Sequence, residues 1–501
     1  MKNLAIVHSR AQSGIEAPPV TVEVHLSSGL PRLSIVGLPE TAVKESKERV
    51  RSAILNSQFA FPNRHIIINL APADLPKEGG RFDLPIAIGI LAASQQIPGA
   101  ALSEYEFTGE LALSGKLRSV CGTLPFAVAT HAAKRRLIAP KQNAKEACLI
   151  QGLTVLPAEH LLEVCAHLNG RQLLTAEVAA PRTDRGFDEL DLSDVQGQSQ
   201  AKRALEIAAA GGHNLLFVGP PGTGKTMLAS RLPGILPPLS QQEAIELASI
   251  YSIRGFKNIG RHFYQRPFRQ PHHTGSAIAL VGGGSIPRPG EISLAHHGIL
   301  FLDELAEFDR KALEILREPL ENGRIAIIRA RHIAEFPADF QLIAAMNPCP
   351  CGYLGARSRS CACSASQIQR YRHRISGPLL DRIDMQLEVP ELPKGSLSHP
   401  LPNESSAVIR KRVIAARHRQ LQRQAVLNAR LCGKALQSYC ALGKSEQSLL
   451  ESACEKLKLS ARSYHRIMKM ARTIADLDDS NSILAPHLTE ALSYRNLETR
   501  N

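Results

Sequence analysis

Eight consecutive residues near the middle of the chain have the composition of a phosphate-binding loop. They are Gly219, Pro220, Pro221, Gly222, Thr223, Gly224, Lys225 and Thr226, and they follow the largely apolar run Asn214–Val218. A buried strand that leads through a glycine-rich turn into a helix points backbone N–H groups and the positive helix end at phosphate oxygens. In that arrangement Lys225 reaches the β- and γ-phosphates, and the Thr226 hydroxyl holds Mg²⁺.

A second apolar run, Gly298–Leu302, ends on the acidic pair Asp303 and Glu304. At the end of a central parallel strand, the first carboxylate of such a pair holds Mg²⁺ through water and the second polarises the attacking water. Two acids after a strand often mark an ordinary turn, but here they follow a phosphate loop in the same domain. The two motifs together predict that the chain binds and hydrolyses ATP, with Glu304 as a catalytic residue.

Two more residues are candidates for the same reaction. Asn347 follows the apolar run Phe340–Met346, and a polar side chain at that strand end can orient the attacking water; the alternative is a simple Asn-Pro turn. Arg382 lies in residues 376–384, Ser-Gly-Pro-Leu-Leu-Asp-Arg-Ile-Asp. In ring ATPases an arginine here reaches the neighbouring subunit's site and neutralises charge on the γ-phosphate; the alternative is a structural Arg–Asp pair.

Four of the ten cysteines are clustered directly behind Asn347, as two Cys-x-Cys pairs: Cys349, Cys351, Cys361 and Cys363. Four thiolates on a loop rich in Gly, Ser and Arg can close a tetrahedral Zn²⁺ site and staple a loop that has little core of its own. Zinc pairs are usually spaced Cys-x-x-Cys, so unligated thiols are the alternative to a structural zinc ion.

The composition predicts a soluble protein of two or three domains with a polyanionic partner. The 501 residues carry a net charge of +14 and 44% hydrophobic residues, and the positive excess favours nucleic acid as the partner. Leu84–Ala93, the longest apolar stretch near the front, is too short to span a bilayer, and the N-terminus has no signal layout. We therefore expect a cytoplasmic protein without a membrane partner.

The order of apolar and polar segments predicts an α/β protein of three parts. Residues 1–170 alternate strands with helical stretches, residues 191–390 hold the motifs described above, and residues 406–501 are helical throughout. The polar, Pro-containing residues 171–190 and 391–405 are expected to be linkers.

Two basic segments of the middle domain are candidates for DNA contact. One is a long insertion rich in Gly, Pro and His before the acidic strand, and the other is a predicted hairpin at 324–332. Their arginines could contact phosphates without reading bases. They are Arg269 and Arg288 in the insertion and Arg329 and Arg331 at the hairpin tip. Because only 4% of residues are aromatic and none is Trp, we expect backbone electrostatics rather than base stacking.

Two segments of the first domain resemble the proteolytic domain of Lon proteases, residues 76–83 and residues 108–115. That family uses a Ser–Lys dyad, and the resemblance places its serine at about Arg81 and its lysine at about Phe126. Neither residue can do this chemistry, because arginine stays protonated and phenylalanine has no proton to exchange. The resemblance thus implies a Lon-like α/β domain without peptidase activity, which serves assembly or DNA contact.

Along essentially its whole length the chain resembles the ComM/YifB family, in the magnesium-chelatase-like group of AAA+ ATPases. The resemblance rests on the Lon-like front, on Cys-Pro-Cys-Gly at 349–352 and on residues 376–384. It implies an AAA+ P-loop core with a parallel sheet and a C-terminal helical lid, in which Arg462 senses nucleotide. It also implies a hexameric, ATP-driven helicase that promotes branch migration when incoming single-stranded DNA recombines in natural transformation.

Two other functions remain open at this stage. A chelatase-type AAA+ subunit would remodel a protein partner during metal insertion, but such subunits lack the Lon-like front domain and the four-cysteine loop. An ATP-dependent protease would need the Ser–Lys dyad that Arg81 and Phe126 replace. ATP hydrolysis stimulated by single-stranded or branched DNA would separate the DNA motor from both alternatives.

Overall fold

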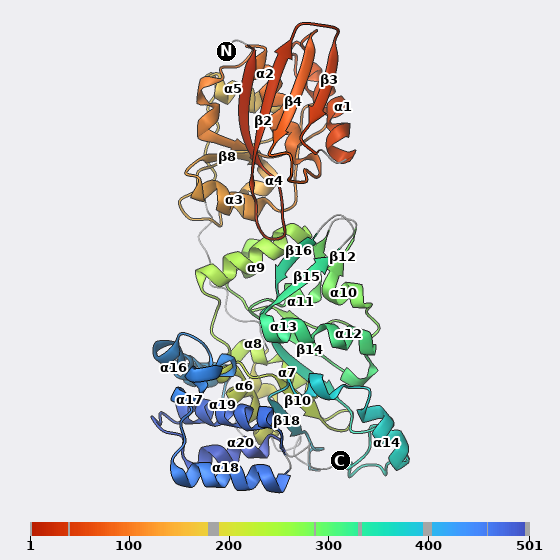
Figure 1. Cartoon of the computed structure of the whole chain (residues 1–501), viewed down its shortest axis with the longest axis vertical. Helices are drawn as coiled ribbons and strands as arrows, with labels where there is room; N and C mark the ends of the chain where they lie inside the picture. The colour runs from red at the N-terminus through yellow and green to blue at the C-terminus, as the bar shows by residue number, and fades with distance from the viewer. Residues whose placement is uncertain are drawn as a thin grey trace. The chain divides into compact units, whose positions relative to one another are not determined.

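The structure is a computed structural model that describes residues 3–38, 41–178, 190–284, 287–328, 333–393, 403–457 and 459–495. The chain forms two units (Figure 1). The N-terminal unit contains Met1–Asp184 together with Gln241–Phe263, and the second unit contains Arg185–Ser240 and Tyr264–Asn501. A segment of the expected ATPase core, Gln241–Phe263, is therefore part of the N-terminal unit.

The N-terminal unit is built on a seven-stranded sheet with strand order β3-β4-β2-β1-β5-β8-β9. The pairs β1–β2 and β2–β4 are antiparallel and the others are parallel. The strands are β1 (Leu4–Arg10), β2 (Pro19–Ser27), β3 (Arg32–Val36), β4 (His65–Ala71), β5 (Tyr105–Phe107), β8 (Arg136–Pro140) and β9 (Val155–Ala158). The helices are α1 (Thr41–Asn56), α2 (Asp83–Ala93), α3 (Thr123–Ala132), α4 (Lys141–Ala147) and α5 (Leu161–Leu168). A short hairpin pairs β6 (Glu110–Leu111) with β7 (Leu117–Arg118).

The two positions expected to replace a peptidase dyad have structural contacts of their own. Arg81 donates from Nη2 to Gln12 Oε1 at 2.7 Å and to the Cys121 carbonyl at 3.2 Å. Phe126 is a core residue of α3 with 1% of its surface exposed. A guanidinium bound to two acceptors and a buried benzyl group leave neither a nucleophile nor a base at these two positions.

Helix α9 (Gln241–Arg254) completes the N-terminal unit although it comes from the middle of the chain. Its Ser252 accepts hydrogen bonds from the Gly122 N–H through its carbonyl, at 3.1 Å, and from the Leu124 N–H through its hydroxyl, at 3.1 Å. Both donors lie at the start of α3, where helix N–H groups have no partner within the helix. Helix α9 therefore caps α3.

The second unit is organised around a five-stranded parallel sheet with strand order β11-β14-β17-β10-β18. Its strands are β11 (Phe268–Arg269), β14 (Ile299–Leu302), β17 (Gln341–Met346), β10 (Leu215–Val218) and β18 (Met385–Glu388). Every residue of β10, β14 and β17 is buried. Such continuous apolar runs are typical of parallel strands that are covered on both faces.

The remaining elements of the second unit, apart from its C-terminal helices, are short helices and hairpins. The helices are α6 (Ser199–Gly211), α7 (Lys225–Ser230), α8 (Leu232–Ile235), α10 (Ala277–Val281), α11 (Glu291–Leu294), α12 (Arg310–Ile315), α13 (Arg317–Asn322), α14 (Ala365–Arg372) and α15 (Gly377–Leu380). The hairpins pair β12 (Gly282–Gly283) with β13 (Arg288–Pro289), and β15 (Arg324–Ile328) with β16 (Ile333–Pro337). Helices α12 and α13 are separated at Leu316, because Pro319 has no N–H to continue the hydrogen-bond pattern of α12.

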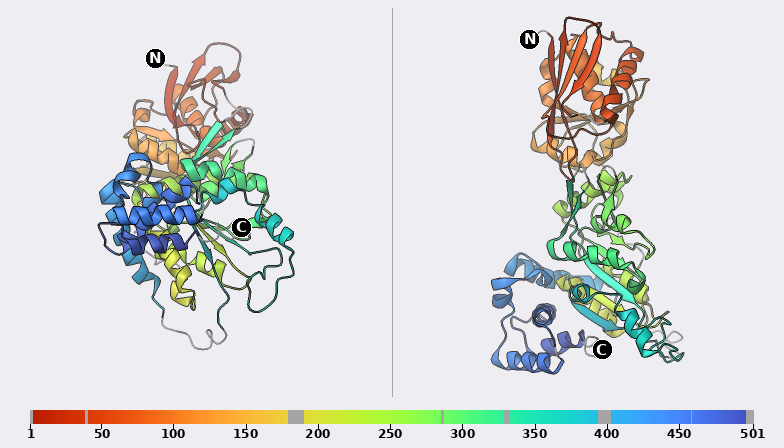
Figure 2. Two further views of the ribbon diagram at one scale, coloured as in Figure 1. Left: turned by 60° about the horizontal axis from the view of Figure 1, so that its bottom comes forward. Right: turned by 45° about the vertical axis from the view of Figure 1, so that its right-hand side comes forward.

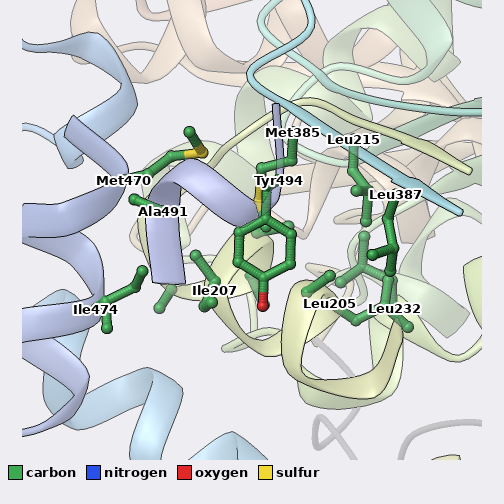
Figure 3. Packing of buried hydrophobic residues seen from close by; sticks show 14 of the residues in the cluster. Leu205, Ile207, Leu215, Leu232, Met385, Leu387, Met470, Ile474, Ala491 and Tyr494 are labelled. Atoms are coloured by element: carbon green, nitrogen blue, oxygen red, sulfur yellow. The ribbon is translucent and has the colours of Figure 1, made fainter. Parts of the chain in front are cut away.

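The C-terminal helices, called the lid here, are α16 (Ser406–Gln424), α17 (Gly433–Tyr439), α18 (Lys444–Leu457), α19 (Ala461–Leu477) and α20 (Ala485–Ser493). In both views of Figure 2 they lie together on one side of the second unit. Figure 3 shows lid side chains such as Met470, Ile474 and Ala491 in one apolar cluster with Ile207 of α6. None of the helices in the described ranges is both long enough and apolar enough to cross a membrane.

The arginines of the basic helix α16 contact other helices of the second unit. Arg417 Nε donates to the Ala209 carbonyl of α6 at 2.8 Å, and Arg423 pairs with Asp476 of α19 at 2.7 Å. Its arginines thus join the lid to α6 as well as carrying charge.

Ile474→Ala should destabilise the second unit by about 2–5 kcal/mol, because it opens a cavity in the cluster that α19 shares with α6. The urea midpoint of unfolding measures the change. Leu421→Ala, at a position on α16 with 49% of the surface exposed, is the matched control, with an expected change within about 0.5 kcal/mol. Equal midpoints for the two variants would contradict a shared core.

Candidate nucleotide site

The glycine-rich loop follows β10, and its backbone conformation requires glycine at three positions. Gly219 donates to the Met346 carbonyl at 3.2 Å, and a Cβ at this position would lie 2.3 Å from the Val389 carbonyl oxygen. Gly222 and Gly224 have φ of 78° and 87°, values that side chains rarely adopt. The second of these glycines precedes α7, so the helix begins at Lys225.

Lys225 is buried at the point where β10 and β17 end. Its Nζ donates to the carbonyls of Gly219 at 2.7 Å and Pro220 at 2.8 Å, and it lies 3.3 Å from Asn347 Oδ1. Burial lowers the pKa of Lys225, although Asp303 and Glu304 favour its charged form. The lysine and the asparagine were expected to serve one site, and the structure brings them together.

Thr226 and Asp303 form an oxygen pair suited to Mg²⁺. The Thr226 hydroxyl donates to Asp303 Oδ2 at 2.6 Å, and Asp303 Oδ1 accepts from the Glu304 N–H at 3.0 Å. Magnesium prefers hydroxyl, carboxylate and water oxygens together with phosphate oxygens. The donor set therefore fits the ion predicted from the sequence.

Glu304 has a strained backbone and a histidine neighbour. Its φ is 53°, in the left-handed region that only a few per cent of non-glycine residues occupy. Its Oε2 lies 3.0 Å from His273 Nδ1, and half of the side chain is exposed. The carboxylate is thus held at the same edge of the sheet as Asp303.

These groups meet because β10, β17 and β14 are adjacent and parallel. Val218 lies opposite Met346, and Leu302 lies opposite Ala344. The residues that follow each strand therefore share the carboxyl edge of the sheet, where ligands of open α/β sheets bind.

Arg382 and Arg462 lie at the opposite edge of the same sheet. Both line a cavity of about 400 Å³ together with Asn214, Phe340 and Asp384. Those three residues directly precede β10, β17 and β18. Since the four residues of β10 span about 13 Å, one chain does not place its Arg382 or Arg462 beside its own Lys225.

Each of the two arginines has an acidic neighbour. Arg382 pairs with Glu321 and donates from Nη1 to the Pro378 carbonyl at 2.7 Å. Arg462 Nη1 lies 3.8 Å from Asp381 Oδ2, and 63% of its side chain is exposed. Arg462 can therefore reach a ligand outside its own chain.

Asp384 and Arg466 belong to this cavity and were missed in the sequence. Arg466 donates to Asp384 at 3.1 Å. Burial opposes the charged form of Asp384, but His213 and Arg466 hold its pKa well below the ordinary range. A signal was present, because Arg466 follows Arg462 by four residues, the spacing of one helix face.

Comparisons with known proteins place the chain in a family. The family models "Magnesium chelatase, subunit ChlI", "Subunit ChlI of Mg-chelatase" and "Magnesium chelatase, subunit ChlI C-terminal" match residues 191–397, 22–143 and 403–495. The uncharacterized protein YifB of Salmonella typhimurium is 54% identical, over 99% of this chain and 98% of its own. The competence protein ComM of Haemophilus influenzae is also 54% identical, over 98% of this chain and 97% of its own. The chain belongs to the ComM/YifB family.

Membership of the ComM/YifB family confirms the predicted fold class. The chain is a mixed α/β protein with a magnesium-chelatase-like AAA+ domain, a parallel sheet and a helical C-terminal region. Lon protease 2 of Bacillus subtilis is a weaker match, 26% identical over 31% of this chain and 32% of its own. The AAA+ assignment implies ATP and Mg²⁺ as ligands.

The four arginines expected to contact DNA differ in their surroundings in this ComM/YifB protein. Arg269, on β11, forms a two-bond pair with Glu291 at 2.7 and 2.8 Å, so its charge is already neutralised. Arg288 is exposed on β13. Arg329 and Arg331 lie outside the described residues, between the paired strands β15 and β16.

The four clustered cysteines come together on the loop behind Asn347. Cys349 Sγ lies 3.4 Å from Cys351 Sγ and 3.6 Å from Cys361 Sγ, and all four sulfurs lie within 4.8 Å of one another. Tetrahedral zinc with Zn–S bonds of 2.3 Å separates sulfurs by about 3.8 Å. The arrangement is compatible with Zn²⁺.

Proposed function

We propose that the protein is an ATP-driven, ring-shaped DNA helicase of the cytoplasm that promotes branch migration when incoming DNA recombines during natural transformation. One observation carries the proposal: the phosphate-loop groups and the two arginines lie at opposite edges of one sheet. Each chain then supplies parts of two sites, and a complete site forms only between neighbouring copies. Head-to-tail contacts of this kind close into rings, and the family resemblance indicates six subunits.

In the proposed mechanism each group of the chain has a separate role in ATP binding or hydrolysis. The residues from Gly219 to Gly224 surround the phosphates with N–H groups, and Lys225 neutralises the β- and γ-phosphates. Thr226 and Asp303 would hold Mg²⁺, which when bound would neutralise phosphate charge. Glu304 polarises the attacking water and Asn347 orients it. Arg462 of the neighbouring copy, and its Arg382 once that side chain leaves Glu321, stabilise charge that develops during cleavage.

DNA is the proposed polymer because the chain is basic and the related ComM is named a competence protein. Arg288, Arg329 and Arg331 are the proposed phosphate contacts, while Arg269 would first have to leave Glu291. Binding through phosphates weakens steeply with salt.

The test is ATP-dependent branch migration of a synthetic three- or four-stranded junction by the purified protein. We expect migration with ATP and Mg²⁺ and none without ATP. A protein that hydrolyses ATP but leaves every junction unchanged would contradict the helicase.

Glu304→Gln should bind ATP normally and lower its turnover about 10²–10³-fold, because the amide cannot polarise water as the carboxylate does. Phosphate release and nucleotide retention measure the two effects. Glu307→Gln is the matched control, since the Glu307 carboxylate is held by Arg374 at 2.8 Å. Normal turnover by Glu304→Gln would remove Glu304 from the mechanism.

We also propose that Cys349, Cys351, Cys361 and Cys363 hold a structural zinc ion. The protein purified and dialysed against a mild chelator should retain about one zinc ion per chain, as measured by elemental analysis. Cys361→Ser should lose it, whereas Cys432→Ser, at an exposed position outside the cluster, should not. Folded protein without metal would contradict the site.

A chelatase-type subunit that remodels a protein partner is the second candidate, favoured by the three family models. It predicts ATP turnover that responds to a partner protein and not to DNA.

A further inference from the structure

Arg495, the last described residue, is fully buried. Its Nη1 donates to the carbonyls of Ile383 at 2.8 Å and Asp384 at 3.2 Å, and its Nη2 donates to the Ser463 hydroxyl at 3.0 Å. Burying a guanidinium costs free energy that an apolar side chain of the same size would avoid. What the planar, forked group adds is a fixed geometry between the acceptors on either side of it.

The two segments that Arg495 joins are those that carry Arg382 and Arg462. Ile383 and Asp384 follow Arg382 directly, and Ser463 follows Arg462 in the first turn of α19. Arg495 is itself fixed to the sheet, because the Gln386 N–H of β18 donates to the carbonyl of the preceding residue, Tyr494, at 2.7 Å.

Two further links connect the same segments. Arg466 of α19 donates to Asp384 at 3.1 Å, and Asp384 also accepts from the Asn214 N–H at 3.0 Å. The side-chain amide of Asn214 in turn donates from Nδ2 to the Arg382 carbonyl at 2.9 Å. The network therefore connects the backbone of Arg382 to the helix that carries Arg462, without using either guanidinium.

We propose that Arg495 is a positioning residue that fixes the spacing of Arg382 and Arg462, so that both enter the neighbouring copy's nucleotide site as one rigid pair. The inference rests on the proposed function, in which the site is shared between copies. Misplacing a catalytic group by about 1 Å can lower a rate about 100-fold, so a loosened pair lowers turnover without changing the phosphate loop at the other edge of the sheet.

Arg495→Lys keeps the charge, but a single ammonium cannot hold both segments in the geometry of the fork. We expect kcat for ATP in the assembled protein to fall about tenfold or more, with KM unchanged within about twofold. Ser463→Ala removes only the link to α19 and should shift kcat in the same direction by less. Thermal unfolding and oligomer size are measured for each variant.

Mixing subunits separates positioning from simple damage. Lys225→Ala subunits have intact arginines, so sites that pair them with the phosphate loop of Arg495→Lys subunits are complete. The mixture should hydrolyse ATP faster than the sum of the two separate proteins. A parallel mixture of Arg382→Ala with Lys225→Ala tests the shared site itself.

Each outcome decides one claim. If the Arg382→Ala mixture gains no activity, the shared site fails and the inference fails with it. If that mixture gains activity while Arg495→Lys keeps normal kcat, or its own mixture gains nothing, the positioning role alone is wrong. Should Arg495→Lys not fold, Ser463→Ala replaces it in both assays, and normal kcat of Ser463→Ala overturns the inference.

Discussion

Lys225→Ala should abolish nucleotide binding at working concentrations and lower ATP turnover at least about 10²–10³-fold. The ammonium is the buried cation of the loop, within 3.3 Å of Asn347 and bonded to the Gly219 and Pro220 carbonyls. Titration with a fluorescent ATP analogue measures affinity, and phosphate release measures turnover.

Lys141→Ala is the matched control for this result. Lys141 is an exposed lysine of the N-terminal unit that pairs with Glu159, and exposed pairs contribute about 0–1 kcal/mol. Affinity and turnover of this variant should equal those of the unmodified protein. Normal nucleotide affinity of Lys225→Ala would show that ATP does not bind at this loop.

Arg382→Ala should leave nucleotide affinity unchanged and lower kcat about 10³–10⁵-fold in the assembled protein, the range known for arginines that act on a transferring phosphoryl group. The separation of affinity from rate follows from geometry, because Arg382 lies at the amino edge of the sheet and Lys225 at the carboxyl edge. Binding and single-turnover hydrolysis are measured on the same oligomer.

Arg317→Ala is the control substitution. Arg317, at the start of α13, pairs with Glu314 of the preceding helix α12. It should keep normal kcat. Loss of affinity in Arg382→Ala, or normal turnover by its full assembly, would contradict a role in the neighbouring site.

The position of the candidate catalytic groups at the carboxyl edge could be predicted from the sequence because each follows an apolar run. Asp303, Asn347 and the phosphate loop needed only the rule that parallel strands end at one edge. Their strands proved adjacent, so the side chains met as expected. The hairpin predicted at 324–332 is also present, and the residues of its first strand, β15, alternate between exposed and buried.

What could not be predicted depends on packing between distant segments. Arg462 was expected to sense nucleotide, but the edge of the sheet that it occupies follows from how the lid packs on α6. The pairing of Arg269 with Glu291 removes a cation that looked available for DNA. Nothing in the local pattern of Gln241–Phe263 indicates that it completes the N-terminal unit. No sequence motif distinguishes Arg495 from the other arginines, and only its long-range acceptors support the role proposed for it.

The most direct test of the central claim is the rate of ATP hydrolysis by the purified assembly with and without branched DNA, measured over a series of salt concentrations. We predict a severalfold higher rate of ATP hydrolysis with DNA than without it. This stimulation should fall steeply as the salt concentration rises, because the protein binds DNA through electrostatic contacts with phosphates. The same rate at every salt concentration, whether DNA is present or absent, would contradict a motor that moves along DNA.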